Sequence, residues 1–441
     1  MIQYRKAEDY MMNFSEWLGT RHRGWIIFGV GTLGFLISNF YRVSITVTSL
    51  DLSHDLHLNT TQLGHLSASF FYAFAFSQIP AGLALDRFGV RRVFLFLSLL
   101  GVPGTLLFAL AQTFGQALWG RMLMGIGMSC NLMGLLVLLA AWFPANRFAT
   151  LMGSAVGLGT VGGLLAATPL VVMNRALGWR GSFLLLALVN LGYVLLFLGL
   201  IQDRPSGRIQ FRPMEKSSLK DLIQVFKFPA YWIISLATFF RYGCFTALQG
   251  LWAGPYLVKA IGLSTLQTGN ALFMMGVGYM VGLPLFGRIS DHWLGSRKKL
   301  IYPSLWVMAL LILSLAYWPK NFNLAWVYLV FMALGLASAP GQLMYPHIKE
   351  LVPDQATGTA LSGINLFTML GAAIITQLIG ALVEDKAPGS MGPESFQAAW
   401  VLCGAGLTLA GVLYLLVPDT RVSTRQDDLS SRSIQHGSIG L

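Results

Sequence analysis

The chain has 441 residues, of which 55% are hydrophobic and only 11% are charged, whereas an average soluble domain has about 25% charged residues. A water-soluble protein of this composition could not cover its own surface, so the soluble classes are excluded. Runs of about 20 apolar residues recur along nearly the whole length and predict a helical protein that spans a membrane many times. The net charge of +12 would fit a nucleic-acid partner, but the basic residues follow the predicted membrane topology, so no nucleic acid is expected.

Twelve spans are predicted along the chain, six on each side of a polar and basic segment. The first six cover 24–50, 62–84, 93–111, 117–142, 149–173 and 182–201, and the second six cover 231–258, 268–288, 300–317, 324–345, 357–382 and 396–417. The predicted division is a cytoplasmic N-terminal segment (1–23), a six-helix bundle (24–201), a cytoplasmic linker (202–230), a second six-helix bundle (231–417) and a cytoplasmic tail (418–441).

The orientation follows from the basic residues in alternate connections. The connections on the side of the two termini and of the linker hold 22 of the 30 Lys and Arg residues, and the opposite connections hold five. Cytoplasmic loops carry the excess of Lys and Arg, so both termini are expected in the cytoplasm. We expect a multi-pass protein of a cell membrane, with a bacterial inner membrane as the best fit to the compact loops.

Two spans carry an arginine at a depth where charge is costly. Arg42 lies in the first span, within the sequence FYR (40–42), and Arg241 lies in the seventh span, within RYG (241–243). Each costs about 2.5–3.5 kcal/mol at the centre of a membrane helix. Acidic residues do not occur inside the predicted spans, so the arginines are expected to face a water-filled cavity that attracts anions. Arginine suits carboxylate and phosphate because its planar group donates two parallel hydrogen bonds.

Short motifs are repeated in the two halves. The second span ends in GLALDRFGVRR (82–92), and the eighth span ends in GRISDHWLGSRKK (287–299). The first of these resembles the loop motif between the second and third spans of the major facilitator superfamily, and RMLMGIG (121–127) resembles its fourth-span motif. The resemblance covers about 24–417. It implies an all-α integral membrane fold of twelve transmembrane helices in two pseudo-symmetric six-helix bundles, with the substrate site between them.

Within that superfamily, FYR and RYG resemble the organophosphate:phosphate antiporters and related organic-anion transporters, which place one arginine on the first span and one on the seventh. Val43 stands where those proteins have a second cation, and the fifth span around Thr160 lacks their histidine. These two departures favour a carboxylate or another organic anion over phosphate exchange.

The candidate site residues form two groups. The predicted substrate-binding group contains the two arginines and nearby polar residues in membrane-depth helices: Arg42, Arg241, Tyr41, Tyr242, Gln249, Asn39, Asn131, Asn365 and Gln342. The predicted gating group contains the loop motif, its second copy and the fourth-span arginine: Asp86, Arg87, Gly89, Arg91, Arg92, Asp291 and Arg121. The role of the gating group is implied by the resemblance.

The predicted function is secondary transport of a small organic anion, a carboxylate or a phosphorylated metabolite, by alternating access. Symport, anion exchange and the use of His65 or His347 as a proton carrier are all compatible with the sequence. Two alternatives stay open: export of a drug or siderophore-like compound, and a transporter-like receptor that senses an anionic ligand. A monomer in the lipid bilayer is expected, without cofactor, metal or enzymatic activity, because the sequence has no nucleotide-binding loop, zinc spacing or nucleophile motif.

Overall fold

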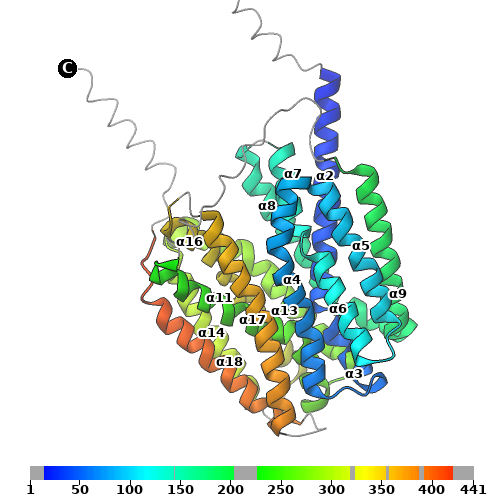
Figure 1. Cartoon of the computed structure of the whole chain (residues 1–441). Helices are drawn as coiled ribbons and strands as arrows, with labels where there is room; N and C mark the ends of the chain where they lie inside the picture. The colour runs from blue at the N-terminus through cyan, green and yellow to red at the C-terminus, as the bar shows by residue number, and fades with distance from the viewer. Residues whose placement is uncertain are drawn as a thin grey trace, which may run out of the picture.

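The computed structural model describes residues 14–143, 145–202, 226–317, 323–353, 357–386 and 392–420, and every regular element in these ranges is helical. Figure 1 shows the helices of the first half, blue to green, beside those of the second half, green to orange. The first half contains α2 (Phe14–Val43), α3 (Ile45–Asp55), α4 (Thr60–Phe88), α5 (Val90–Ala109), α6 (Phe114–Met128), α7 (Asn131–Trp142), α8 (Ala145–Leu165) and α9 (Thr168–Leu200). The second half contains α11 (Pro229–Ala247), η1 (Leu248–Trp252), α12 (Ala253–Pro255), η2 (Tyr256–Ala260), α13 (Thr265–Arg288), η3 (Ile289–Leu294), α14 (Lys298–Ala316), α15 (Leu324–Ser338), η4 (Ala339–Leu343), α16 (Met344–Leu351), α17 (Thr357–Lys386) and α18 (Pro393–Tyr414).

The helices correspond to the predicted spans. In the described part of the chain, nine helical stretches are long and apolar enough to cross a membrane. The other three predicted spans are also helical, as α4, as α8 with the start of α9, and as α11 through η2. The all-helical membrane fold with twelve spans is therefore confirmed. Much of the predicted linker and tail lies outside the described residues, so those two segments stay predictions.

One predicted connection and one predicted helix end can be compared with the structure. Within the predicted connection between the fifth and sixth spans, two helical segments of α9 meet at a kink at Gly178, which has a φ of 68°. Glycine adopts this left-handed conformation without a steric penalty, so the turn needs no separate loop. Helix α17 extends to Lys386, beyond the predicted end at residue 382. Glu384 is therefore part of a helix that the sequence placed in a loop.

The first and fourth spans of each half are interrupted at corresponding places, and the fifth span is also interrupted, at Ala166 and Ala167. The first span is interrupted at Ser44, and the fourth at Ser129 and Cys130. The seventh span becomes π-helical at η1, and the tenth becomes a 3-10 helix at η4. Breaks of this kind free backbone carbonyls inside the membrane, where only protein groups or a water-filled cavity can satisfy them. Their matching places agree with the internal repeat.

Small residues bring the helices of each bundle close together. A Cβ atom added to Gly162 of α8 would lie 2.0 Å from the carbonyl oxygen of Leu36 in α2. In the second bundle, a Cβ atom added to Gly335 would lie 2.0 Å from the carbonyl oxygen of Met275. Neither glycine can be replaced without separating its helix pair, which is the packing expected between membrane helices.

The two bundles meet at the far end, which we define as the end that carries the loops after α3, α5 and η2. There the Thr46 hydroxyl donates a 2.5 Å hydrogen bond to the backbone oxygen of Gln249, and the Thr168 hydroxyl lies 2.9 Å from the Asn270 side-chain oxygen. Helices α4 and α17 also run side by side across the boundary between the bundles (Figure 1). The interface between the bundles is therefore sealed at the far end.

Loops of the first bundle are tied together at the far end by Asp55. Its carboxylate accepts a 2.9 Å hydrogen bond from the Trp179 indole and pairs with Arg180, and Arg180 also donates to the Ala111 carbonyl at 3.2 Å. The Trp179 hydrogen bond first, and Arg180 next among the favourable partners, lower the pKa of the Asp55 carboxyl from its ordinary value. A carboxyl whose pKa is lowered by folding stabilises the folded state at neutral pH, and the stabilisation is lost as pH falls.

We expect Asp55→Asn to lower the apparent thermal unfolding midpoint by about 1–3 °C at pH 7, because the pair is partly exposed. The difference from the parent should begin to shrink as pH falls below about 4, the ordinary pKa of aspartate, and should disappear once pH falls below the lowered pKa of Asp55 in the folded protein. Thermal unfolding between pH 3 and 8 measures both effects. Asp51→Asn, on the same helix but without a comparable set of partners, is the control, and an equal loss in both variants would contradict the expectation.

Candidate functional site

Arg42 lies in the last turn of α2, immediately before the break at Ser44. Its side chain is almost buried, with 9% exposed. One terminal nitrogen donates a 3.2 Å hydrogen bond to the Tyr242 hydroxyl, and the guanidinium lies 4.6 Å from the centre of the Phe74 ring. The Nε atom of Arg42 has no hydrogen-bond partner within the described part of the chain. This arginine therefore faces the second bundle with part of its hydrogen-bonding capacity unused.

Arg241 lies in α11 and is fully buried. Its Nη1 atom donates to the Ser338 carbonyl oxygen at 3.4 Å, at the point where α15 gives way to η4, and the Tyr279 hydroxyl also interacts with the guanidinium. The guanidinium lies 5.5 Å from the centre of the Tyr242 ring, and Nε and Nη2 lack a well-aligned hydrogen bond to any described residue. The irregular tenth span thus supplies a carbonyl to an arginine that is otherwise poorly satisfied.

Tyr242 connects the two cations. Its hydroxyl accepts from Arg42, and its ring lies against Arg241. Neither arginine pairs with a carboxylate in the described part of the chain, where the ion pairs involve other residues. Two buried cations without a counter-charge favour an anion between them, because the low dielectric of the interior strengthens the attraction.

A shell of phenols and amides surrounds this centre. The Gln342 amide donates to the Tyr279 hydroxyl at 2.7 Å, and the Tyr279 ring packs 5.0 Å from that of Phe245. The Tyr345 hydroxyl donates to Asn365 at 3.2 Å, and Asn365 donates across the bundle boundary to Gln78 at 2.5 Å. Each of these groups can donate and accept hydrogen bonds, which suits a substrate with hydroxyl groups.

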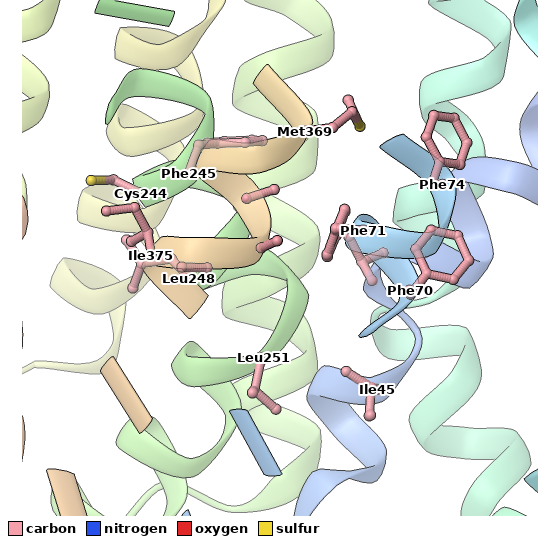
Figure 2. Close-up of a cluster of buried hydrophobic side chains, with 14 of the residues drawn as sticks. Ile45, Phe70, Phe71, Phe74, Cys244, Phe245, Leu248, Leu251, Met369 and Ile375 are labelled. Carbon is pink, nitrogen blue, oxygen red and sulfur yellow. The ribbon is translucent and has the colours of Figure 1, made fainter. Parts of the chain in front are cut away.

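An apolar layer continues the bundle boundary on the side of the far end. Figure 2 shows Phe71 and Phe74 of α4 and Ile45 of α3 opposite a second-bundle surface that includes Met369 of α17 and Leu251 of η1. Phe71 is fully buried, and Met369 is 3% exposed. Because Phe74 also contacts Arg42, this layer lies directly beside the arginine centre.

The structure places four predicted substrate-binding residues away from this centre. The Tyr41 hydroxyl donates to the Leu186 carbonyl at 3.3 Å inside the first bundle. Asn39 donates to Phe35 of its own helix, and Asn131 donates to the Gly34 carbonyl at 2.8 Å. Gln249 lies at the bundle boundary beside Val43 and Thr46, in a crevice too narrow to hold a water molecule. Tyr41 and Asn131 therefore join different helices of the first bundle, whereas Asn39 bonds only within α2.

Arg121 is fully buried within the first bundle. It donates to the Tyr41 carbonyl oxygen at 3.0 Å and lies 4.8 Å from the Phe70 ring centre. The Tyr41 carbonyl belongs to the irregular first span, so Arg121 supports that break as Arg241 supports the break in the tenth span. Its position suits a structural role near the site.

The two loop motifs form matching turns. Gly89 and Gly295 both have a positive φ, of 81° and 55°. Arg91 donates to the Leu198 carbonyl at 2.7 Å, and Arg92 is exposed. Arg87 lies 5.3 Å from the Phe88 ring centre. The side chain of Asp86 lies outside the described residues, so its predicted role is not addressed by the structure.

The second copy is a network of charges. Asp291 pairs with Arg297, and Arg297 pairs with Glu350 at 3.2 Å. Arg297 also donates to the Ser290 hydroxyl at 3.0 Å. The network joins the turn before α14 to the end of the tenth span within the second bundle.

Sequence reasoning missed two residues of this region. Tyr279 was not selected because a tyrosine in an apolar helix has no distinguishing local signal, although its spacing of three residues from Gly276 places both on the same face of α13. Glu384 was assigned to a loop because α17 was predicted to end too early. Among the described residues, no group of three His, Cys, Asp or Glu side chains is arranged to hold a metal ion.

Gly341 determines where Arg241 lies. A Cβ atom at this position would lie 2.3 Å from Nε and 2.7 Å from Cδ of Arg241, so Gly341→Ala must displace the guanidinium. We expect the affinity for an organic anion to fall at least tenfold, because about 1 Å of misplacement is costly in a rigid site. Isothermal titration measures the affinity. Gly287→Ala is the control, since its Cβ atom would meet nothing within 4 Å, and equal affinities of the two variants would refute the expectation.

Comparisons with known proteins agree with this architecture. The sequence profile of the Major Facilitator Superfamily matches residues 26–253 and again residues 234–435. A probable galactarate/D-glucarate transporter of Escherichia coli K12 is 25% identical over 441 aligned positions, which cover 90% of this chain and 94% of the relative. A probable sulfoacetate transporter of Cupriavidus necator is 27% identical over 285 positions, which cover 62% of this chain and 65% of the relative.

Among solved structures, a bacterial homologue of the human lysosomal transporter Spinster, in an inward-facing and unoccupied conformation, has a similar fold. The two structures agree with a TM-score of 0.74 at 16% identity, over 90% of this chain and 97% of the other. The fold, the repeated loop motifs and the profile matches over both halves lead to one conclusion. The chain belongs to the major facilitator superfamily and is a membrane transporter of the organic-anion type, not an enzyme.

Proposed function

We propose that the protein transports small organic acids with two anionic groups and that Arg42 and Arg241 hold the substrate. The observation that carries the proposal is the convergence of two buried guanidinium groups on Tyr242, with no carboxylate paired to either in the described residues. The names of the two relatives support it. Galactarate and D-glucarate have a carboxylate at each end, and sulfoacetate has a carboxylate and a sulfonate.

In this proposal the substrate replaces a weak contact with a strong one. Arg42 donates a hydrogen bond to the Tyr242 hydroxyl, which is an uncharged acceptor. A hydrogen bond to an ionised acceptor is about twice as strong as one between neutral groups, so an acid group displaces the phenol. The second acid group meets the unused Nε and Nη2 atoms of Arg241. The substrate then joins the two bundles, because one arginine comes from each.

The surrounding shell gives the substrate its remaining contacts. Gln78 and Asn365 already form a hydrogen bond across the bundle boundary, and Tyr279 with Gln342 lies on the second bundle. These side chains take the hydroxyl groups of a sugar acid. We therefore favour hydroxylated dicarboxylates over phosphorylated metabolites as substrates.

Transport proceeds by rocking of the bundles about the arginine centre. The basic residues put both termini in the cytoplasm of what we propose is a bacterial inner membrane, so the far end faces the outside. The structure then has its outer side sealed, and the loop motifs with Arg87, Arg91 and Asp291 act as gates on the inner side. Symport and anion exchange both fit. Uptake into vesicles without internal anions separates them, because an exchanger needs an internal partner.

Binding to purified protein tests the proposal. We compare galactarate with galactonate, which has one carboxylate, with galactitol, which has none, and with sugar phosphates. Galactarate at a hundredfold excess over its dissociation constant should stabilise the protein by about 2.7 kcal/mol. Arg42→Gln and Arg241→Gln should each weaken binding by at least about 30-fold, or ~2 kcal/mol.

The unfolding midpoints of the two arginine variants without added substrate provide a second test. Removal of an uncompensated buried cation should leave the unfolding midpoint unchanged or higher, because that charge costs free energy in the membrane. Lys259→Gln, an exposed cation at the far end, is the matched control and should bind as the parent does. Equal binding of galactitol and galactarate, or unaltered binding in both arginine variants, would refute the proposal.

A further inference from the structure

The boundary between α4 and α17 contains a row of polar contacts at the far end, separate from the arginine centre. Glu384 of α17 accepts a 3.0 Å hydrogen bond from the Thr60 backbone nitrogen and a second one from the Thr60 hydroxyl. Further along, Gln377 lies 2.9 Å from a ring nitrogen of His65 and accepts from the Tyr72 hydroxyl at 2.9 Å. Each of these contacts joins one bundle to the other.

The backbones approach closely at the same place. A Cβ atom added to Gly380 would lie 2.9 Å from the Thr60 carbonyl oxygen, and one added to Gly64 would lie 3.3 Å from the Thr376 carbonyl oxygen. Two glycines, one from each helix, therefore bring Glu384 within reach of the start of α4. This approach requires the bundles to be closed at the far end.

Glu384 satisfies the first turn of a helix in the opposite bundle. The first N–H groups of a helix lack partners inside the helix, and the helix dipole favours a negative charge there. Within α4, Asn59 accepts from the Gln62 nitrogen, and the Thr60 nitrogen is left for Glu384. Glu384 is the charged member of the row in the structure, so its hydrogen bonds to Thr60 are the charge-assisted ones.

We propose that Glu384 is a positioning residue that holds the outer gate of the transporter closed. Its two hydrogen bonds to Thr60 exist when the bundles meet at the far end and are lost when they separate. An interaction that one conformation makes and the other lacks shifts the equilibrium between the two. The inference rests on the alternating access in the proposed function, and it concerns the gate rather than the substrate site.

A purely structural cap would behave differently. If Glu384 only stabilised the fold, its loss would lower the unfolding midpoint and leave the two conformations equally populated. If it holds the gate, its loss raises the population of the conformation that is open at the far end. Accessibility of the sealed boundary separates the two roles, and the measurement needs no substrate.

The test uses a single cysteine as a reporter of gate opening. Ser67 of α4 is fully buried, and it lies one turn from both Gly64 and Phe71, on the sealed side of the apolar layer. The reporter Ser67→Cys is placed in full-length protein in which the three native cysteines, all buried, are replaced by alanine. The rate of modification by a maleimide reports the open population when closing is faster than modification.

We expect Glu384→Gln to raise the modification rate by roughly tenfold, because a charge-assisted pair of hydrogen bonds becomes neutral. Thr60→Val keeps the backbone donor and should give a smaller increase. The two changes combined should add less than the sum of their effects, because both break the same contact. Glu394→Gln is the control, an exposed carboxylate at the far end in the first turn of α18, and should stay within twofold of the parent.

Modification of a folded, monodisperse Glu384→Gln protein at the parent rate overturns the proposal. If that variant does not fold, the modification rate of the Thr60→Val variant is measured instead. A rate equal to that of the parent again overturns the proposal. Additive effects in the combined variant also contradict it. Loss of dicarboxylate binding without faster modification would question the substrate site instead, so the two proposals can fail separately.

Discussion

The burial of two unpaired cations is the constraint on which the rest of the structure depends. Arg42 and Arg241 come from equivalent spans of the two halves, and both are removed from water. Such a pair is costly in a membrane unless an anion, an aromatic face or a backbone carbonyl compensates it. The protein supplies only partial compensation, through Tyr242, Phe74 and the Ser338 carbonyl. The remaining capacity is what a dianionic substrate would use.

The irregular spans and the far-end seal serve this centre. A regular helix has no free carbonyl for Arg241, so the 3-10 turn at η4 is needed beside it, and Gly341 leaves room for the guanidinium. The break after Arg42 likewise separates the inner helix α2 from α3, which packs at the sealed end. Glycines on α4 and α17 allow the bundles to close over the site. In the proposals made above, binding and gating use different residues on the same boundary.

The fold was predictable because its signals are long-range sums over many residues. Apolar runs, repeated loop motifs and basic loops all indicate the membrane topology. Each remains recognisable when a helix end is misplaced by a few residues. The two arginines were predictable for the same reason, since a charge in an apolar run is conspicuous. The residues that surround the two arginines were not predictable from the sequence. Tyr41 and Tyr242 are each adjacent to an arginine in the sequence, yet the Tyr41 side chain points into its own bundle. The rotation of a helix about its axis is set by packing against its neighbours, which a single sequence does not reveal. Glu384 was missed because α17 ends four residues later than predicted.

Transport by the reconstituted protein tests the central claim most directly. Proteoliposomes loaded with unlabelled galactarate exchange it for labelled galactarate added outside, and galactitol serves as the neutral compound of the same carbon skeleton. The account predicts accumulation of labelled galactarate, no accumulation of galactitol, and loss of the signal in the Arg42→Gln, Arg241→Gln double variant. Accumulation of galactitol at a comparable rate, or galactarate exchange that persists in the double variant, would contradict it.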